Sequence, residues 1–227
     1  MYKNVIIIPY RQREEHLEYF IKHTVPLIEE CMPETKVVVI EQCDGKLFNR
    51  GKVLNVGFKE YLDKTEYFIT NDVDINPTKK CIEEHYVKEV DINDVLGIYT
   101  SCCDTLGGII KIKSKTIHKI NGFPNDYWGW GAEDKALQNR SEYYNIKKHT
   151  NLMNDKKHPD YLLRFDNIND RHIGCKSKHF NSYHLFKKLS NEEKLKEILS
   201  SGLNTLEYKV IERKELHKIV ELIKVEI

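Results

Sequence analysis

The chain has 227 residues, of which 36 are Lys or Arg and 35 are Asp or Glu, so its formal net charge is +1. This balance provides no global field that would attract nucleic acid or an anionic membrane, and we expect neither as a partner. A hydrophobic fraction of 40% with 13 tyrosines is typical of a folded chain rather than a disordered one. The length suits one α/β domain.

Cysteine usage and hydropathy indicate the compartment. None of the six cysteines has Cys-x-x-Cys spacing and two are adjacent, so we expect free thiols rather than a zinc ribbon or a disulfide framework. The apolar run that follows Asn4 is too short for a signal peptide core, and no run approaches the length of a membrane span. We therefore predict a soluble, cytoplasmic protein without membrane insertion.

The first half of the chain alternates strand and helix patterns. Residues 4–10 and 36–42 are short, β-branched and uninterrupted, as strands buried on both faces are. Between them, residues 14–30 carry apolar side chains at near-helical spacing. Strand, helix and strand in this order predict a parallel pair in an α/β sheet.

The later elements are predicted in the same way. A second helix covers 51–64, and a third strand covers 65–77 with a break at Asn71. Residues 95–100 and 107–120 indicate further strands or a short helix. The C-terminal part indicates a helix from 191 followed by two strands, 205–212 and 217–226.

Two carboxylates follow the third predicted strand. Asp72 and Asp74 are two residues apart, so on an extended chain they point the same way. Ligands of open α/β sheets bind at the carboxyl ends of the strands, and such a pair can hold Mg²⁺ or Mn²⁺ beside a nucleotide diphosphate. The alternative interpretation of this Asp-x-Asp is a solvated loop.

Basic and aromatic residues follow the first two strands. Arg11 and Arg13 can contact phosphates, while Phe48 and Arg50 are suited to stacking on a base and contacting a phosphate. A surface helix start and an ordinary loop are the alternatives. Neither a P-loop nor G-x-G-x-x-G is present, which disfavours ATPase and dinucleotide functions. Together the three strand ends predict a nucleotide and metal site.

Five segments in chain order carry a family resemblance: "IIPYRQREEHL", "EQCDGKLFNRGKVLNVGF", "NDVDINP", "GGIIKIKSKTIHKINGFPNDYWGWGAEDKALQNR" and "SGLNTLEYKV". In them the chain resembles the β-1,4-galactosyltransferase family from residue 5 to about 212. The resemblance implies a GT-A fold, a mixed central sheet flanked by helices. It divides one domain, 1–227, into a UDP and metal half, about 1–110, and a lid and acceptor half, about 111–227.

The resemblance also implies an activity. Family members transfer galactose, or in some members N-acetylgalactosamine, from the UDP-sugar with inversion, usually to the 4-hydroxyl of a sugar acceptor. Mn²⁺ is the usual cofactor, with Mg²⁺ as an alternative. A UDP-sugar donor and a glycan or glycoconjugate acceptor would be the partners. The donor residues would be Pro9, Tyr10, Arg11, Arg13, Phe48, Arg50, Asp72, Val73, Gly108 and Trp130.

The stretch Trp128-Gly129-Trp130-Gly131 matches the mobile lid of the family. Glycines supply backbone freedom for a hinge, and the tryptophan that matches Trp130 covers the donor and excludes water. The interleaved glycines disfavour the alternative of two tryptophans packed in a core. By the resemblance, Asp134 is the general base. The acceptor would contact Glu133, Trp130, Gly131, Phe165 and Ile168.

The chain departs from the family at several positions. Asp74 would ligate the metal, but the family's M-x-x-H and H-x-H patterns are absent, so we predict His158 as its partner and keep His149 as the alternative. Lys135 stands where the family carries a further acid, which would alter acceptor binding or loop dynamics. Thr105 stands where galactose-transferring members carry Tyr, and its smaller side chain leaves room for a donor N-acetyl group.

Three other functions were weighed against this one. The same scaffold can use another UDP-sugar donor. A non-catalytic UDP- or glycan-binding module would have lost Asp74, Trp130 or Asp134, and all three are present. A nuclease-like metal hydrolase would need more clustered acids and a basic surface than this chain offers.

Overall fold

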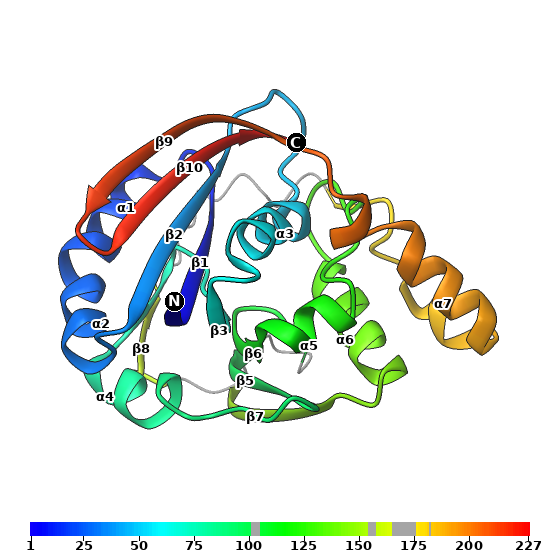
Figure 1. Cartoon of the computed structure of the whole chain (residues 1–227), viewed down its shortest axis with the longest axis horizontal. Helices are drawn as coiled ribbons and strands as arrows, with labels where there is room; N and C mark the ends of the chain where they lie inside the picture. Colours follow the sequence, from blue (N-terminus) through cyan, green and yellow to red (C-terminus); the bar gives the residue numbers. More distant parts are fainter. Residues whose placement is uncertain (101–104, 154–157, 165–175, 182) are drawn as a thin grey trace.

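The computed structural model describes residues 1–100, 105–153, 158–164, 176–181 and 183–227 (Figure 1). In this part of the chain eight strands form one mixed sheet in the order β7-β5-β6-β3-β1-β2-β10-β9, and β4 and β8 form a separate antiparallel pair. The strands are β1 (Tyr2–Tyr10), β2 (Thr35–Gln42), β3 (Thr65–Thr70), β4 (Ile75–Pro77), β5 (Asp94–Thr100), β6 (Ile109–Lys113), β7 (Lys147–Met153), β8 (Leu162–Arg164), β9 (Lys209–His217) and β10 (Val220–Glu226).

The centre of the sheet is parallel. β1 lies between β2 and β3 and runs parallel to both, with Ile6 opposite Val37 on one side and Ile69 on the other. All three residues are fully buried, which is why their β-branched side chains suit a strand covered on both faces. Since parallel strands share a direction, the carboxyl ends of β1, β2 and β3 meet at one edge of the sheet.

Helices cover both faces of this sheet (Figure 1). The helical segments are α1 (Glu14–Tyr19), η1 (Phe20–Thr24), α2 (Val25–Cys31), α3 (Arg50–Tyr61), α4 (Lys79–Cys81), η2 (Ile82–Tyr86), α5 (Ser114–Lys119), α6 (Glu133–Tyr143), η4 (Tyr183–Lys188), α7 (Asn191–Ser200) and η5 (Leu203–Thr205). Among them, η1 and η2 are π-helical, and η4 and η5 are 3₁₀ turns.

The two hydrophobic cores follow the alternation of side chains along the strands. Ile6 and Ile8 of β1 pack on the side of α1 and α2, whereas Val5 and Ile7 pack on the side of α3 and α5. Successive residues of a strand point to opposite faces, so one run of apolar residues supplies both cores. β1 therefore fixes the sheet between its two helical layers.

Most predicted elements are confirmed. The predicted strands 4–10 and 36–42 become β1 and β2, and the predicted helix 14–30 forms as α1, η1 and α2 in succession. The predicted strand 65–77 divides into β3 and β4, with its break at Asn71 as expected. There Asn71 donates from its side chain to the carbonyl oxygen of Ile75 at 2.9 Å, which closes the turn between the two strands.

The bounds of the last two strands were predicted wrongly. The predicted strands 205–212 and 217–226 begin later than expected: Thr205 ends the 3₁₀ turn η5, and β9 runs from Lys209 to His217. The hairpin turn then falls at 218–219, and β10 begins at Val220. The pairing of β9 with β10 sets these bounds, which the alternating pattern alone does not define.

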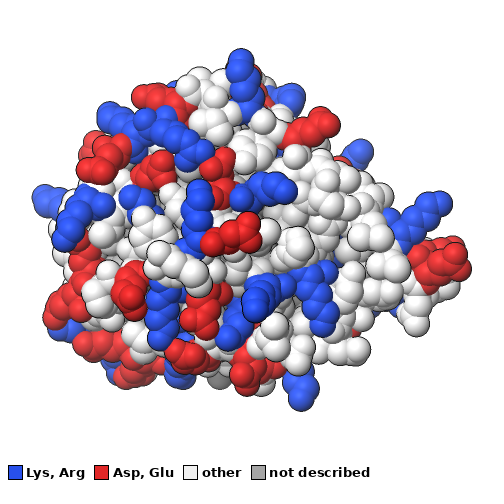
Figure 2. Space-filling view, in the orientation of Figure 1, with Lys and Arg blue, Asp and Glu red and all other residues white. Residues whose placement is uncertain are grey.

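The surface charges and the helices relate to the expectation that nucleic acid and membrane are not partners. Acidic and basic side chains alternate over the face shown in Figure 2, and neither sign forms a continuous field there. In the described parts of the chain, every helix is either too short or too polar to cross a membrane.

Candidate active site

Residues from the ends of the three parallel strands meet at the carboxyl edge of the sheet. Tyr10 ends β1, and three residues later Arg13 Nη1 lies 3.4 Å from Asp74 Oδ2, which follows β3. The two residues are 61 positions apart in sequence. The fold thus joins the predicted phosphate-contacting arginine to the predicted metal ligand.

Arg50 at the start of α3 contacts three other predicted residues. Its Nε donates to Asp72 Oδ1 at 2.8 Å, its Nη2 donates to the carbonyl oxygen of Gly108 at 3.4 Å, and its Nη1 lies 3.6 Å from Glu133 Oε1. Burial disfavours the charge on Arg50, but the carboxylates of Asp72 and Glu133 outweigh this and raise its pKa. Arg50 therefore stays a cation held between the donor residues and the acidic pair.

One nitrogen of this guanidinium is held without a hydrogen bond. Arg50 Nη1 is buried and has no hydrogen-bond partner within the described residues, because the Glu133 carboxylate beyond it forms only the longer ion pair. A buried charged donor in this state is costly unless a ligand completes it. The arrangement suits an incoming anionic oxygen.

The loop that carries Phe48 is tied down at its C-terminal end. Asn49 caps α3 by accepting from the backbone N–H of Lys52 at 2.9 Å, and its own backbone N–H donates to Gln42 Oε1 at 2.9 Å. Its side-chain amide donates to the carbonyl oxygen of Asn125 at 2.8 Å. The cap thus fixes both the first turn of α3 and the segment that leads to the lid.

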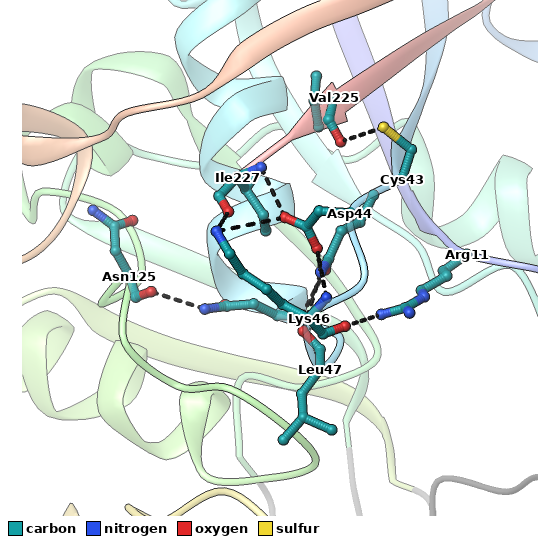
Figure 3. Close-up of polar contacts among 10 residues, drawn as sticks. Arg11, Cys43, Asp44, Lys46, Leu47, Asn125, Val225 and Ile227 are labelled. Atoms are coloured by element: carbon teal, nitrogen blue, oxygen red, sulfur yellow. Dashed lines mark hydrogen bonds and ion pairs between the residues drawn. The ribbon is translucent and has the colours of Figure 1, made fainter.

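The same loop is tied to β1 and β10 (Figure 3). Asp44 accepts from the backbone N–H of Lys46 at 3.2 Å and from that of Ile227 at 3.1 Å, and Arg11 donates to the carbonyl oxygen of Lys46. Burial opposes ionisation of Asp44, but its hydrogen bonds, first of all that from Gln42, lower its pKa. Sequence reasoning missed these supporting roles of Gln42 and Asp44.

The two tryptophans of the lid differ in their environment. Trp128 packs against the core on the α3 side, and the ammonium nitrogen of Lys46 lies 5.3 Å from its ring centroid. Trp130 is 55% exposed and stacks on Phe180, with ring centroids 5.5 Å apart. Of the two, only Trp130 has the exposed ring that the predicted lid requires. Nothing in the sequence around Phe180 predicted it as the partner.

The backbone around Trp130 connects the lid to both sides. The N–H of Gly129 donates to the carbonyl oxygen of Phe48 at 2.9 Å, and the carbonyl oxygen of Trp130 accepts from Ser177 at 2.9 Å. Gly131 has a φ of +100°, and a Cβ there would lie 2.7 Å from the Phe180 ring. This position accepts only glycine in the observed arrangement. We call residues 127–134 with 176–180 the lid side, and residues 11–13, 48–50 and 72–74 the donor side.

The acidic pair begins α6. Burial and the neighbouring Asp134 carboxylate raise the pKa of Glu133 to about 7, although the positive charge of Arg50 acts in the opposite direction. Asp134 is held at both oxygens: Oδ1 accepts from the backbone N–H of Lys135 at 2.8 Å, and Oδ2 accepts from the hydroxyl of Thr105. Carboxylates in the first turn are favoured by the helix dipole. Glu133 therefore has a pKa near neutral pH, and the Asp134 carboxylate has a fixed orientation.

The other predicted donor and acceptor residues are distributed as follows. Tyr10 and Val73 are buried in the core on the α1 side, and Gly108, with a φ of +79°, precedes β6. Pro9 lies within β1 opposite Ile40 of β2. Phe165 and Ile168, predicted to contact the acceptor, lie outside the described residues.

The residues that the structure describes do not complete a metal site. In these ranges no three His, Cys, Asp or Glu side chains come close enough to hold an ion. The register of β4 on β8 pairs Ile75 with Arg164 and Pro77 with Leu162, so His158 lies beyond the Pro77 end, away from Asp74. Mn²⁺ and Mg²⁺ need more oxygen or nitrogen ligands than Asp74 provides.

The alternative ligand is placed no better. His149 lies on β7 with its Nε2 3.3 Å from Asp94 Oδ2, and two strands, β5 and β6, separate β7 from β3. The geometry therefore supports Asp74 as a donor of one ligand but supports neither histidine as its partner.

Comparison with solved structures defines the class of protein. The Drosophila β-1,4-galactosyltransferase 7 mutant in complex with manganese, UDP-Gal and xylobiose superposes with a TM-score of 0.76 at 22% identity, covering 100% of this chain and 94% of that one. A mannosyltransferase from Pyrobaculum calidifontis in complex with GDP-Man and Mn²⁺ gives 0.54 at 12% identity, over 70% of this chain and 58% of that one. The fold is the GT-A fold of nucleotide-sugar glycosyltransferases.

Sequence comparison identifies the family. Residues 1–84 match the N-terminal region of glycosyl transferase group 7, and residues 92–161 match the N-terminal domain of galactosyltransferase. Bovine β-1,4-galactosyltransferase 1 is 31% identical over 93% of this chain, and human β-1,4-galactosyltransferase 4 is 38% identical over 63%. The chain belongs to the β-1,4-galactosyltransferase family. It spans about half the length of these relatives, 51% and 43% respectively.

Proposed function

We propose that the protein transfers galactose or N-acetylgalactosamine from its UDP-sugar to a hydroxyl of a glycan acceptor, with inversion and a β-1,4 linkage. The observation that carries this proposal is Arg50, which joins the donor side, through Asp72, to the acidic pair, through Glu133. A buried cation beside a strand edge recognises an anionic donor. The carboxylates beside it supply a base for the acceptor.

In the proposed reaction the acceptor hydroxyl oxygen forms a bond to the anomeric carbon while the bond from that carbon to the UDP oxygen breaks. Asp134 takes the proton of the hydroxyl, and the electron pair of the broken bond leaves with UDP. Inversion needs a single base on the face opposite the leaving group. Arg13 and Arg50 hold the diphosphate, and Trp130 covers the donor so that water is excluded.

We propose in addition that activity depends on Mn²⁺, with Mg²⁺ as an alternative, and that Asp74 is one ligand. The donor and acceptor classes are those in the complex of the Drosophila relative, which holds UDP-Gal, manganese and xylobiose. Thr105 is small and buried, which supports acceptance of UDP-GalNAc beside UDP-Gal.

A UDP-release assay tests the proposal. UDP-sugars are screened with Mn²⁺ or Mg²⁺, with and without simple β-linked GlcNAc, glucose and xylose acceptors. Acceptor-stimulated release from UDP-Gal or UDP-GalNAc that EDTA abolishes is the expected result. UDP binding without release from any donor would favour the non-catalytic module instead, and release from another UDP-sugar alone would change the donor.

The role of Asp134 has its own test. Asp134→Asn should lower transfer by ~10²–10⁴-fold while UDP still binds, because a positioned base contributes about that much. Glu142→Gln, at the exposed end of the same helix, is the matched control and should retain wild-type turnover. Loss of UDP binding together with activity in Asp134→Asn would contradict this role.

A further inference from the structure

Thr105 reaches the proposed base from a segment 29 residues earlier in the chain. Its hydroxyl donates to Asp134 Oδ2, and its side chain is 4% exposed. The other carboxylate oxygen, Oδ1, accepts from the backbone N–H of Lys135 at 2.8 Å. With one hydrogen bond on each oxygen, the carboxylate cannot turn without losing one of them.

The next residues of that segment restrict the carboxylate independently. A Cβ added at Gly107 would lie 2.9 Å from Asp134 Oδ2 and 3.4 Å from Asp134 Cβ. At Gly108 the φ is +79°, and a Cβ would lie 2.6 Å from the carbonyl oxygen of Tyr99. Thr105 and Gly107 therefore lie directly against Asp134, with glycine at 107 where a side chain would push the carboxylate away.

We propose that Thr105 is the positioning residue of the general base, a role that rests on the proposed function. The hydroxyl fixes the orientation of the Asp134 carboxylate, which receives the acceptor proton in the proposed reaction. An ionised carboxylate has about four lone-pair sites, so two hydrogen bonds leave room for the acceptor hydroxyl. Thr105 then acts through its hydroxyl as well as through the small volume it leaves for the donor.

The test compares Thr105→Val, which keeps the shape and removes the hydroxyl, with Thr105→Ser, which keeps the hydroxyl. Hydrogen bonds to charged groups are worth ~1.5–3 kcal/mol, so Thr105→Val should lower kcat by roughly 10- to 100-fold. KM for the UDP-sugar should change little. Thr105→Ser should restore most of kcat.

A structural or donor-only role gives a different pattern. If Thr105 merely shapes the donor pocket, Thr105→Val, which keeps that shape, will leave both kcat and the preference between UDP-Gal and UDP-GalNAc near wild type, which would overturn the proposal. Thr105→Ala, which is smaller and cannot clash, replaces Thr105→Val if the latter fails to fold by circular dichroism.

A second measurement is independent of turnover. In protein labelled with carboxyl-¹³C aspartate, the Asp134 signal is assigned by its absence in Asp134→Asn. The chemical shift of that signal at one fixed pH should change in Thr105→Val, which removes the hydrogen bond, and return in Thr105→Ser; an unchanged signal contradicts the proposal. Absence of UDP release from the wild-type protein would count against the proposed function, whereas this chemical-shift comparison tests Thr105 alone.

Discussion

The donor side and the lid side of the site are built in different ways. The donor side consists of chain that leaves three neighbouring parallel strands, so its residues are brought together by the sheet itself. The lid side lies outside the sheet: Trp130 pairs with Lys176 in an isolated β-bridge and stacks on Phe180, and Thr105 donates to Asp134. The donor side is therefore fixed by the sheet, and the lid side by one isolated bridge and by individual side chains.

The largest effect is expected where the two sides are joined. Arg50→Ala leaves the partly buried carboxylates of Asp72 and Glu133 without their cation. Breaking a fully buried pair from one side typically costs ~3–5 kcal/mol, and this partly exposed pair should cost somewhat less. Urea denaturation should show this loss, together with loss of UDP binding. Lys79→Ala, which breaks an exposed pair with Glu30, should leave the unfolding free energy nearly unchanged. Equal effects of the two variants would mean that Arg50 does not join the sides.

Glu133 provides a pH-dependent test on the lid side of that link. The folded protein holds this proton until about pH 7, whereas the unfolded chain releases it near the ordinary value of 4.5. Between these values the folded state binds more protons, so the contribution of Glu133 to the unfolding free energy is complete below about pH 4.5 and is lost as the pH rises through 7.

Glu133→Gln should remove this component. The difference in unfolding free energy between wild type and Glu133→Gln should change steadily across that pH window and level off above it, as measured by denaturation at several pH values. Glu142→Gln is the control and should run parallel to wild type. A constant difference between Glu133→Gln and wild type would show that folding does not raise the pKa of Glu133.

The sequence predicted the two sides unequally, for the same physical reason. Strand periodicity placed Arg13, Arg50 and Asp72 at one sheet edge, and the structure confirms that they gather there. The roles of Asp134 and Trp130 came from the family motif alone. The hydroxyl bond from Thr105 and the stacking of Phe180 depend on tertiary placement, which neither periodicity nor motif encodes.

The two tryptophans sharpen the difference between core and lid. Trp128→Ala should cost roughly half of the ~3–5 kcal/mol of a fully buried aromatic, because Trp128 is only partly buried in the core on the α3 side. Trp130→Ala should leave stability close to wild type, because this ring is exposed. It should lower transfer severalfold, because in the proposed reaction the ring covers the donor. Thermal denaturation and the UDP-release assay distinguish them. A stability loss in Trp130→Ala larger than in Trp128→Ala would reverse the assignment.

The smallest expected effect compares a helix cap on the donor side with one elsewhere. Asn49→Ala removes the N-cap of α3 and should cost ~1 kcal/mol. Because the same side chain also donates to the carbonyl oxygen of Asn125 and adjoins Arg50, UDP affinity should fall as well. Ser190→Ala removes the capping box of α7, in which Ser190 bonds Glu193 rather than a donor-side residue. This variant should lower stability and retain UDP affinity. Isothermal titration with UDP compares the affinities of Asn49→Ala and Ser190→Ala. An equal loss of affinity in both variants would show that the stability of the whole fold, rather than the α3 cap, holds the donor side.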